Sequence, residues 1–364
     1  MTSRAEGGQR RRALVVGTGL IGGSIALGLR QRGWHVSGLD VDEERLDAAR
    51  HAEVIDVAGD DLGAEVVFIA VPAAAVAAVA RGLLDDDRRR PDAVVTDVSG
   101  VKTSIVEEAD HPRFIGGHPM AGSEQTGLHG ADPDLFVGAV WALTPTTATE
   151  LEAFDRLKGV VTGLGADVLV LSAADHDRLV AVVSHVPHLV AATLMNAATD
   201  GAEQDRTLLR LAAGGFRDMT RVAAGHPGIW PDICAENATA IVDALDALLT
   251  DLGAMRDLVA ARDRDGILAS LQKASAARRS LPARAVRPDH LAELRIRVPD
   301  RDGVIAEIAS LAANADIGIY DIEIAHSAEG DLGVLILVVD GADADTLTVA
   351  VESAGYRARA EQLS

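Results

Sequence analysis

Short apolar runs alternate with amphipathic stretches between residue 10 and about residue 170. The apolar runs are about five residues long, as buried strands are, and the stretches between them carry apolar residues at helical spacing. This alternation predicts an α/β domain with a doubly wound parallel sheet of the Rossmann type. The expected strands are Ala13–Gly17, His35–Asp40, Val66–Val71, Ala93–Asp97, Gly138–Leu143 and Asp167–Leu171, and the expected helices are Leu20–Arg32, Asp42–Arg50 and Ala73–Leu84.

The pattern changes after Ser172, and strand-like runs become rare up to about residue 285. Apolar residues recur there at helical spacing, which predicts an all-α domain. Long apolar helices need a partner surface, and a second copy of the chain supplies one, so we expect a homodimer. The predicted helices are Asp175–Ala198, Glu203–Ala213 and Ile229–Val259.

Residues 290–364 follow a third pattern, after a proline-containing stretch, Ser280–Asp289, that is typical of a linker. The order strand, helix, strand, strand, helix, strand predicts a ferredoxin-like βαββαβ domain. We therefore divide the chain into a flexible tail (1–9), a Rossmann domain (10–172), a helical substrate and dimerisation domain (173–285) and the ferredoxin-like domain (290–364). The elements of the last are Leu291–Val298, Gly303–Ala313, Ile317–Ala325, Gly333–Val339, Asp343–Ser353 and Tyr356–Ala360.

The chain of 364 residues is strongly acidic, with a formal net charge of -21. Such a chain repels nucleic acid and anionic membranes, so we expect neither as a partner. Cys234 is the only cysteine, which excludes an internal disulfide and favours the cytoplasm. Arg10–Arg12 and the apolar stretch Ala13–Leu29 imitate a signal peptide, but the five glycines in that stretch favour strand, turn and helix. We expect no membrane span.

A glycine-rich motif follows the first predicted strand and opens the first predicted helix. It has the spacing of the dinucleotide-binding fingerprint, with glycine at Gly17, Gly19 and Gly22. The first allows a tight turn, the second lets the backbone approach a pyrophosphate, and the third lets helix and strand pack closely. The pyrophosphate then meets free N–H groups at the positive end of the helix dipole. A glycine-rich turn without a ligand is the alternative.

An acidic residue, Asp40, ends the next predicted strand. A carboxylate there binds the adenosine ribose hydroxyls and repels a 2′-phosphate, so the predicted cofactor is NAD in preference to NADP. Leu20 and Ile21 within the motif are expected to contact it. Val71 precedes a proline at the end of another strand and fits a turn beside the cofactor, although a simple strand stop explains the proline equally well.

Four further segments place polar and ionisable groups among glycine and apolar residues. With the glycine-rich motif, they closely resemble the prephenate/arogenate dehydrogenase (TyrA) family, in the family's order, over roughly residues 12–240. Residues 290–364 resemble the ACT domain that some members of that family carry. The four segments are Thr96–Lys102, Gly116–Glu124, Ser184–His188 and Gly214–Arg221, the last continuing to Trp230 and Asn237.

The resemblance implies an NAD-dependent oxidoreductase of tyrosine biosynthesis that converts prephenate to 4-hydroxyphenylpyruvate. Hydride leaves C4 of the ring for the nicotinamide, the ring carboxylate departs as CO₂, and aromatisation drives the step. Arogenate differs only in its side chain, is the alternative substrate, and would give tyrosine directly. The sequence does not distinguish the two.

The 4-hydroxyl must lose its proton as hydride leaves, which requires a neutral imidazole within reach. His118 matches the family's catalytic histidine, the alternative being a loop histidine that caps a turn. A dianionic substrate in an acidic protein needs local cations, and Arg221 matches the family's carboxylate-binding arginine. Arg217 and Gly214, in the same segment, are expected to bind substrate.

The resemblance places His188 near the substrate side chain as a catalytic residue, with His185 in support and Trp230 as a wall for the ring. A core position for the tryptophan is the alternative. The histidines, with His176 and Asp175, also form a conceivable metal site, but the reaction needs no Lewis acid, and we expect no metal.

One segment departs from the family pattern, which commonly reads Asp-x-Gly-Ser-x-Lys with the serine near the substrate hydroxyl and the cofactor. This chain has Ser99 followed by Gly100, the two interchanged. Either Ser99 reaches the site as a catalytic residue through a shifted backbone, or the contact is missing. Lys102 matches the family and is expected beside the cofactor. Glu124 is expected either to support the site or to be an exposed loop acid.

The resemblance to an ACT domain implies an amino-acid site at a dimer interface. Asp300 and Gly303, in the turn that opens a helix, and Asn314 and Ile317, after that helix, are expected to hold a tyrosine or phenylalanine effector. A purely structural oligomerisation module is the alternative. For the whole chain, a dehydrogenase of the 3-hydroxyacid type and a catalytically inactive NAD-linked amino-acid sensor are the competing interpretations.

Overall fold

The computed structural model describes residues 10–121, 127–204, 208–225, 227–280, 291–299, 301, 303–326 and 332–362. The chain folds as two compact units, Met1–Ala261 and Arg262–Ser364. The predicted tail, the predicted linker from residue 281 onwards, Glu124 and Asp300 lie outside the described residues. The division into three domains stays a prediction.

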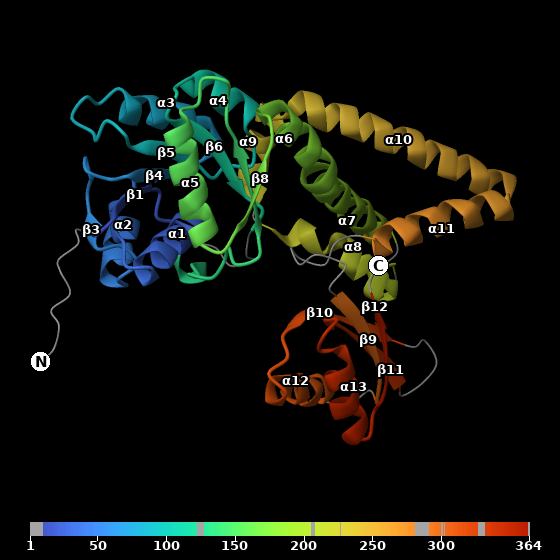
Figure 1. The fold of residues 1–364 in the computed structure, drawn as a ribbon. Helices are drawn as coiled ribbons and strands as arrows, with labels where there is room; N and C mark the ends of the chain where they lie inside the picture. The colour runs from blue at the N-terminus through green and yellow to red at the C-terminus, as the bar shows by residue number, and fades with distance from the viewer. Residues whose placement is uncertain are drawn as a thin grey trace, which may run out of the picture. The chain divides into compact units, whose positions relative to one another are not determined.

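An eight-stranded sheet forms the centre of the first unit, in the order β3-β2-β1-β4-β5-β6-β7-β8 (Figure 1). Neighbouring strands are parallel from β3 to β6, β7 runs antiparallel to β6, and β8 runs parallel to β7. The predicted Rossmann-type sheet is therefore present. Its strands are β1 (Arg12–Val16), β2 (His35–Leu39), β3 (Val57–Ala58), β4 (Val66–Ile69), β5 (Val94–Asp97), β6 (Phe114–Pro119), β7 (Val140–Thr144) and β8 (Asp167–Val170).

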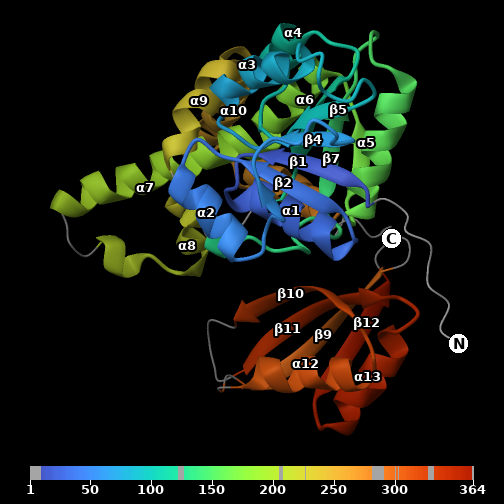
Figure 2. The same ribbon diagram turned by 90° about the vertical axis from the view of Figure 1, so that its left-hand side faces the viewer.

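Helices cover both faces of this sheet (Figures 1 and 2). Helices α1 and α5 pack in one core with Val15 of β1, and helices α3 and α4 pack in a second core with Leu14. Leu14 and Val15 are successive residues of β1, so their side chains point to opposite faces of the sheet. The two cores therefore lie on opposite faces. The helices are α1 (Leu20–Gln31), α2 (Glu43–His51), α3 (Ala73–Leu84), α4 (Thr103–Ala109) and α5 (Leu151–Gly163).

The described residues between Ala173 and Ala261 are helical and contain no strand, as the sequence predicts. A single π-helical segment, η2, widens the first long helix. The elements are α6 (Ala173–Val180), η2 (Ala181–His185), α7 (Val186–Gln204), η3 (Leu208–Leu211), α8 (Gly214–Thr220), η4 (Arg221–Ala224), η5 (Pro227–Ile229), α9 (Trp230–Glu236) and α10 (Ala238–Ala261).

Two of the predicted helices differ from the structure. The predicted helix Glu203–Ala213 is wrong: α7 ends at Gln204, and Leu208–Leu211 is one short 3₁₀ turn. The predicted helix Ile229–Val259 is split at Asn237, where the backbone leaves the helical region (φ -117°, ψ 29°).

The second unit contains a four-stranded antiparallel sheet in the order β10-β11-β9-β12. Its strands and helices follow the predicted order βαββαβ, after a helix, α11, that the sequence analysis did not delimit. Apolar side chains of β9, α12, β11 and α13 form its core. The elements are α11 (Arg264–Arg279), β9 (Leu291–Pro299), α12 (Val304–Asn314), β10 (Ile319–His326), β11 (Leu332–Asp340), α13 (Ala344–Ser353) and β12 (Arg357–Gln362).

The continuous helical stretch Ala173–Gly201 is long and apolar enough to cross a membrane, judged by length and composition alone. Three of its polar side chains, His176, Asp177 and His185, are buried within the first unit. Asp177 accepts hydrogen bonds from the backbone N–H groups of Lys102 and Thr103, in the Rossmann part of that unit. The first part of this stretch, α6 and η2, is therefore held in the fold by polar contacts.

Candidate active site

The glycine-rich loop between β1 and α1 has the geometry that a dinucleotide site needs. Gly17 has a φ of +96°, and a Cβ atom there would lie 2.3 Å from the carbonyl oxygen of Ala70. A Cβ atom on Gly22 would lie 1.9 Å from the carbonyl oxygen of Gly17. No side chain among the described residues caps the start of α1 at Gly19, so its first N–H groups face a ligand position directly.

Asp40 lies directly after β2, and its side chain is hydrogen-bonded to the glycine-rich loop. Its carboxylate accepts hydrogen bonds from the backbone N–H of Thr18 (2.8 Å), the hydroxyl of Thr18 (3.0 Å) and the backbone N–H of Asp42 (3.0 Å). Burial opposes ionisation of Asp40, but these hydrogen bonds and Arg45, 3.5 Å away, outweigh it and lower the pKa of the carboxyl. The group is thus an anion at neutral pH, as the predicted contact with ribose hydroxyls requires.

The half-buried residues Leu20 and Ile21 begin α1, and Val71 follows β4 beside the same loop. A Cβ atom on Gly17 would lie 3.3 Å from the backbone nitrogen of Val71. The two strand ends that the sequence analysis assigned to the cofactor are therefore adjacent. The loop, the anion and the uncapped helix start fit an NAD molecule.

His118 lies near the end of β6, on the carboxyl side of the sheet where ligands of such folds bind. The backbone N–H of Gly117 donates to the carboxylate of Asp97 (3.1 Å), which fastens β6 to the end of β5. Burial lowers the pKa of the His118 imidazole well below its usual range, and the nearby His176, Lys102 and His185 lower it further, while Asp177 opposes them. His118 is therefore neutral at pH 7.

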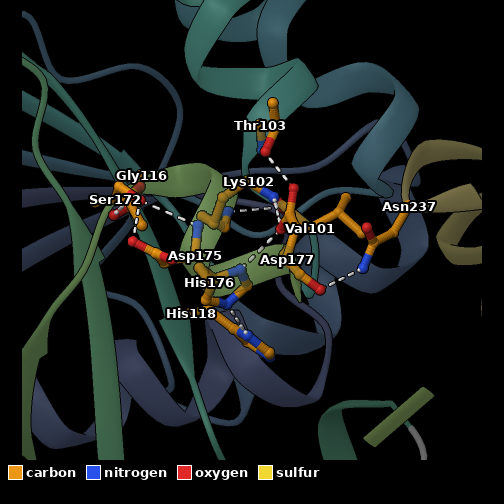
Figure 3. Close-up of polar contacts among 12 residues, drawn as sticks. Val101, Lys102, Thr103, Gly116, His118, Ser172, Asp175, His176, Asp177 and Asn237 are labelled. Atoms are coloured by element: carbon orange, nitrogen blue, oxygen red, sulfur yellow. Dashed lines mark hydrogen bonds and ion pairs between the residues drawn. The ribbon is translucent and has the colours of Figure 1, made fainter. Parts of the chain in front are cut away.

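His118 is hydrogen-bonded to a second histidine from the helical part of the unit (Figure 3). Its Nδ1 lies 2.8 Å from Nε2 of His176, and Nδ1 of His176 lies 2.8 Å from the carboxylate of Asp177. The same carboxylate accepts from the backbone N–H groups of Lys102 and Thr103, both at 2.8 Å, and so caps α4. From the sequence alone, His176 is expected only as an unfavoured metal ligand, and no role is expected for Asp177.

Lys102 does not have the exposure that a cofactor contact requires. Its side chain is fully buried, and its ammonium donates to Asp97 and to the hydroxyl of Ser99, 3.1 Å away. The predicted direct contact with the cofactor is therefore replaced by a structural role, because the ammonium is enclosed by the loop that follows β5. An ion pair of this kind holds the loop in one conformation.

Ser99 also differs from its predicted role. Its hydroxyl bonds to Asp97 and accepts from Lys102, so it serves the same buried ion pair. Gly100 is instead the residue that faces the imidazole: a Cβ atom there would lie 3.8 Å from both Cε1 and Nε2 of His118. Residue 100 therefore offers no hydroxyl beside His118, and the hydroxyl of Ser99 is engaged by Asp97 and Lys102.

The second group of predicted residues is assembled around Trp230. Its ring stacks on His188, with ring centres 3.7 Å apart and an angle of 13°, and meets His185 edge-on at 6.2 Å. The side-chain amide of Asn237 lies 3.3 Å from Nδ1 of His185 and donates to the carbonyl of Asp177 at 2.8 Å. A continuous set of contacts thus joins this group to the histidines around His118.

Arg221 begins the turn η4, directly after α8, and both its side chain and that of Arg217 are exposed. The turn packs against α7 and ends at Gly225, where a Cβ atom would lie 3.7 Å from Cε1 of His188. Arg217 donates to the carbonyl of Ala212, and Gly214 begins α8. The arginine segment therefore lies beside His188.

Two family models match this chain. The model for the prephenate dehydrogenase nucleotide-binding domain matches residues 25–170, and the model for the prephenate dehydrogenase dimerization domain matches residues 172–273. The chain belongs to the prephenate dehydrogenase family. The curated relatives of the family include prephenate dehydrogenase of Bacillus subtilis, which is 34% identical over 88% of this chain and 90% of its own length. The similarity to this relative covers 88% of the 364 residues, which is more than the part of the chain up to residue 273, where the second family model ends. It therefore continues into the second unit.

The chain is also similar to dehydrogenases with related names. Cyclohexadienyl dehydrogenase of Zymomonas mobilis is 31% identical over 73% of this chain and 94% of its own length. The crystal structure of Aquifex aeolicus prephenate dehydrogenase with hydroxyphenyl propionate and NAD⁺ has a TM-score of 0.70 and 28% identity, covering 75% of this chain and 99% of that one. Synechocystis arogenate dehydrogenase has a TM-score of 0.65 and 34% identity, covering 73% of this chain and 98% of that one.

The regulatory residues predicted in the second unit have mixed placements. Gly303 precedes α12 with a φ of +86°, and Asn314 ends that helix with an exposed side chain. Ile317 is buried in the core of the unit, and its predicted contact with an effector stays a prediction. Among the described residues, no group of three or more His, Cys, Asp or Glu side chains is arranged to hold a metal ion.

Proposed function

We propose that this member of the prephenate dehydrogenase family catalyses the NAD-dependent conversion of prephenate to 4-hydroxyphenylpyruvate and CO₂. The observation that carries the proposal is the neutral, hydrogen-bonded imidazole of His118 at the same edge of the sheet as a complete NAD-binding loop. Similarity to prephenate dehydrogenases along 88% of the chain supports the substrate.

NAD, when bound, accepts the hydride that leaves C4 of prephenate. The loop after β1 and the N–H groups at the start of α1 hold its pyrophosphate, and Asp40 binds its ribose hydroxyls. Because Asp40 is ionised and buried, a 2′-phosphate would meet a fixed negative charge, which favours NAD over NADP.

His118 accepts the proton of the 4-hydroxyl and later returns it. As the C4–H bond breaks, its neutral imidazole takes the hydroxyl proton, and the oxygen becomes a carbonyl. The bond to the ring carboxylate then breaks, and its electron pair passes through the ring to that oxygen. The imidazolium returns the proton to the phenolate, so the reaction releases CO₂ and leaves His118 neutral for the next turnover.

The exposed guanidinium of Arg221 is proposed to bind a substrate carboxylate, with Arg217 adding positive charge on the same segment. The stacked pair of His188 and Trp230, next to the end of that segment, forms the wall for the substrate, and His188 contacts its side chain. Prephenate and arogenate differ only at that side chain, so this group decides between them. Arogenate stays the second candidate, because an arogenate dehydrogenase is 34% identical to this chain.

The test is the appearance of NADH absorbance with purified protein and prephenate or arogenate, each with NAD and with NADP. We expect turnover of prephenate with NAD, and a fall of about 10² to 10⁴-fold in His118→Asn, the size of a lost general base. An enzyme that binds NAD and turns over neither substrate would instead be an amino-acid sensor. A wild-type rate in His118→Asn would remove the histidine from the mechanism.

We infer further that the second unit is an ACT-like domain that binds an aromatic amino acid. The βαββαβ order, the antiparallel sheet and the turn at Gly303 support this proposal. Equilibrium dialysis with tyrosine and phenylalanine tests it, with the Gly303→Val variant as the comparison. Binding that the substitution weakens is expected, and no binding of either amino acid would make the unit a structural module.

We also propose a cytoplasmic homodimer formed through the helical part. Apolar side chains of η2 and α10 are exposed in the single chain, among them Val183 (67%) and Leu249 (63%). Burying such faces against a second copy is the usual origin of closed dimers. The match to a dimerization-domain model over residues 172–273 supports the same surface.

A further inference from the structure

A buried pair of residues, His176 and Asp177, has no part in the proton transfer described above. The two residues are only 1% and 5% exposed, and they lie on α6, which follows the last strand of the sheet. Both are aligned with His118 through consecutive hydrogen bonds (Figure 3). Burying an ionisable pair is costly unless its hydrogen bonds are satisfied, so the arrangement needs a reason.

The carboxylate of Asp177 determines the direction of the first hydrogen bond. Burial opposes its ionisation, but hydrogen bonds from His176, Thr103 and Lys102 outweigh burial and lower its pKa. An ionised carboxylate only accepts hydrogen bonds. Nδ1 of His176 therefore carries a hydrogen and donates it to Asp177.

The second hydrogen bond follows from the first. A neutral imidazole with a hydrogen on Nδ1 has a lone pair on Nε2. In the arrangement that we propose, Nε2 of His176 accepts, and Nδ1 of His118, 2.8 Å away, donates to it. The other nitrogen of His118, Nε2, then carries a lone pair and lies on the side of Gly100, where a Cβ atom would be 3.8 Å away.

We propose that Asp177 and His176 are positioning residues that keep His118 in the tautomer with Nε2 unprotonated, the nitrogen that takes the proton of the substrate hydroxyl. When His118 becomes positively charged, the same chain of hydrogen bonds ends on a carboxylate and stabilises the charge. This inference rests on the proposed function. Among the described residues, those whose charge acts most on His118 are His176, Lys102, His185 and Asp177.

Two substitutions of His176 separate the hydrogen bond from the packing. His176→Gln keeps an acceptor near the position of Nε2, whereas His176→Phe keeps a ring and has no acceptor. We expect kcat for prephenate to fall about 100-fold in the phenylalanine variant and less than about 10-fold in the glutamine variant, with KM within about 3-fold of wild type in both. Substituting Asp177 is less informative, because its carboxylate also caps α4.

Nitrogen-15 NMR of the full-length protein with labelled histidine supplies a readout that a packing defect does not produce. The His118 signals are assigned by their loss in His118→Asn. We expect Nδ1 of His118 to carry the hydrogen in wild type and in His176→Gln, and the tautomers to become mixed in His176→Phe. A hydrogen on Nε2 of wild-type His118 would overturn the proposal, and so would a kcat in His176→Phe within about 3-fold of wild type.

The outcomes also distinguish this proposal from the proposed function. If the wild-type protein fails to turn over prephenate, the proposed function fails, and the NMR spectrum alone still decides the tautomer. If prephenate is turned over and the tautomer of His118 does not depend on His176, the function stands and the positioning role is wrong. Should His176→Phe fold poorly, the wild-type and glutamine spectra decide.

Discussion

Gly100 lies against the imidazole of His118, so that a side chain at residue 100 would begin 3.8 Å from Nε2 of the histidine. That distance is an ordinary contact, and residue 100 does not have a positive φ, so a serine fits there without strain. The hydroxyl of Ser99, in contrast, is occupied by Asp97 and Lys102.

The first prediction is that Gly100→Ser improves the enzyme. A hydroxyl beside His118 can share the proton of the substrate hydroxyl, and one neutral hydrogen bond contributes enough to raise kcat/KM about 3- to 10-fold. Steady-state kinetics with prephenate measure it, with Gly100→Ala as the matched control without a hydroxyl. Equal rates in the two variants would show that the hydroxyl is not used.

The second prediction concerns cofactor choice. Asp40→Asn removes the charge and keeps the shape, so Kd for NAD is expected to rise about 10-fold or more, as hydrogen bonds to a charged group are lost. The affinity for NADP is expected to fall less, because the repulsion of the 2′-phosphate disappears. Fluorescence titration with both cofactors measures this, with Asp47→Asn on the exposed face of α2 as the control. An unchanged ratio of the two affinities would contradict the assignment.

The third prediction concerns the substrate carboxylate. Arg221→Lys keeps the positive charge but loses the bidentate hydrogen bonding of a guanidinium to a carboxylate, and Arg221→Ala loses both. We expect KM for prephenate to rise about 10-fold in the lysine variant and about 100-fold in the alanine variant, with Kd for NAD unchanged. If both variants kept the wild-type KM, the arginine would lie outside the substrate site.

The fourth prediction concerns pH and stability. Burial lowers the pKa values of His118, His185 and His188 in the folded protein. Below the ordinary histidine pKa of about 6.5, the unfolded chain therefore binds more protons than the folded chain, and the free energy of unfolding falls as the pH drops. Carboxyl groups with lowered pKa values, such as Asp40, lose their contribution only at more acidic pH.

Urea unfolding between pH 7.5 and pH 5 measures this effect. The His118→Asn variant lacks one of the three groups, so its free energy of unfolding is expected to depend less steeply on pH, by up to about 1.4 kcal/mol per pH unit. Parallel curves for variant and wild type would mean that His118 titrates normally in the folded protein.

The fifth prediction concerns assembly. Leu249→Glu places a charge on the exposed face of α10 and is expected to convert dimer to monomer in sedimentation velocity. Leu151→Glu is the control, because Leu151 is 75% exposed at the start of α5, outside the helical part. A dimer that survives Leu249→Glu but not Leu151→Glu would place the interface elsewhere.

Local patterns were sufficient to predict most elements of the fold. Alternating apolar runs identified β1, β2, β4 and β5, and α3 has the predicted bounds, Ala73–Leu84. Strand β6 was missed, because Phe114–Pro119 contains two glycines and a proline and has no apolar run. The helix predicted over Ile229–Val259 is broken at Asn237 by side-chain bonds to residues far away in the chain, which no periodicity reveals.

The sequence by itself determined the sheet, the NAD-binding loop and the family, because each depends on residues a few positions apart whose spacing is a property of one strand, turn or helix. The tertiary structure decided which atoms act on His118. Its partner His176 is 58 residues away, and Asp177 reaches Lys102 across 75 residues. Only packing brings such residues together, and it also decided that Gly100 lies against the imidazole, since the loop after β5 meets β6 only in the folded chain.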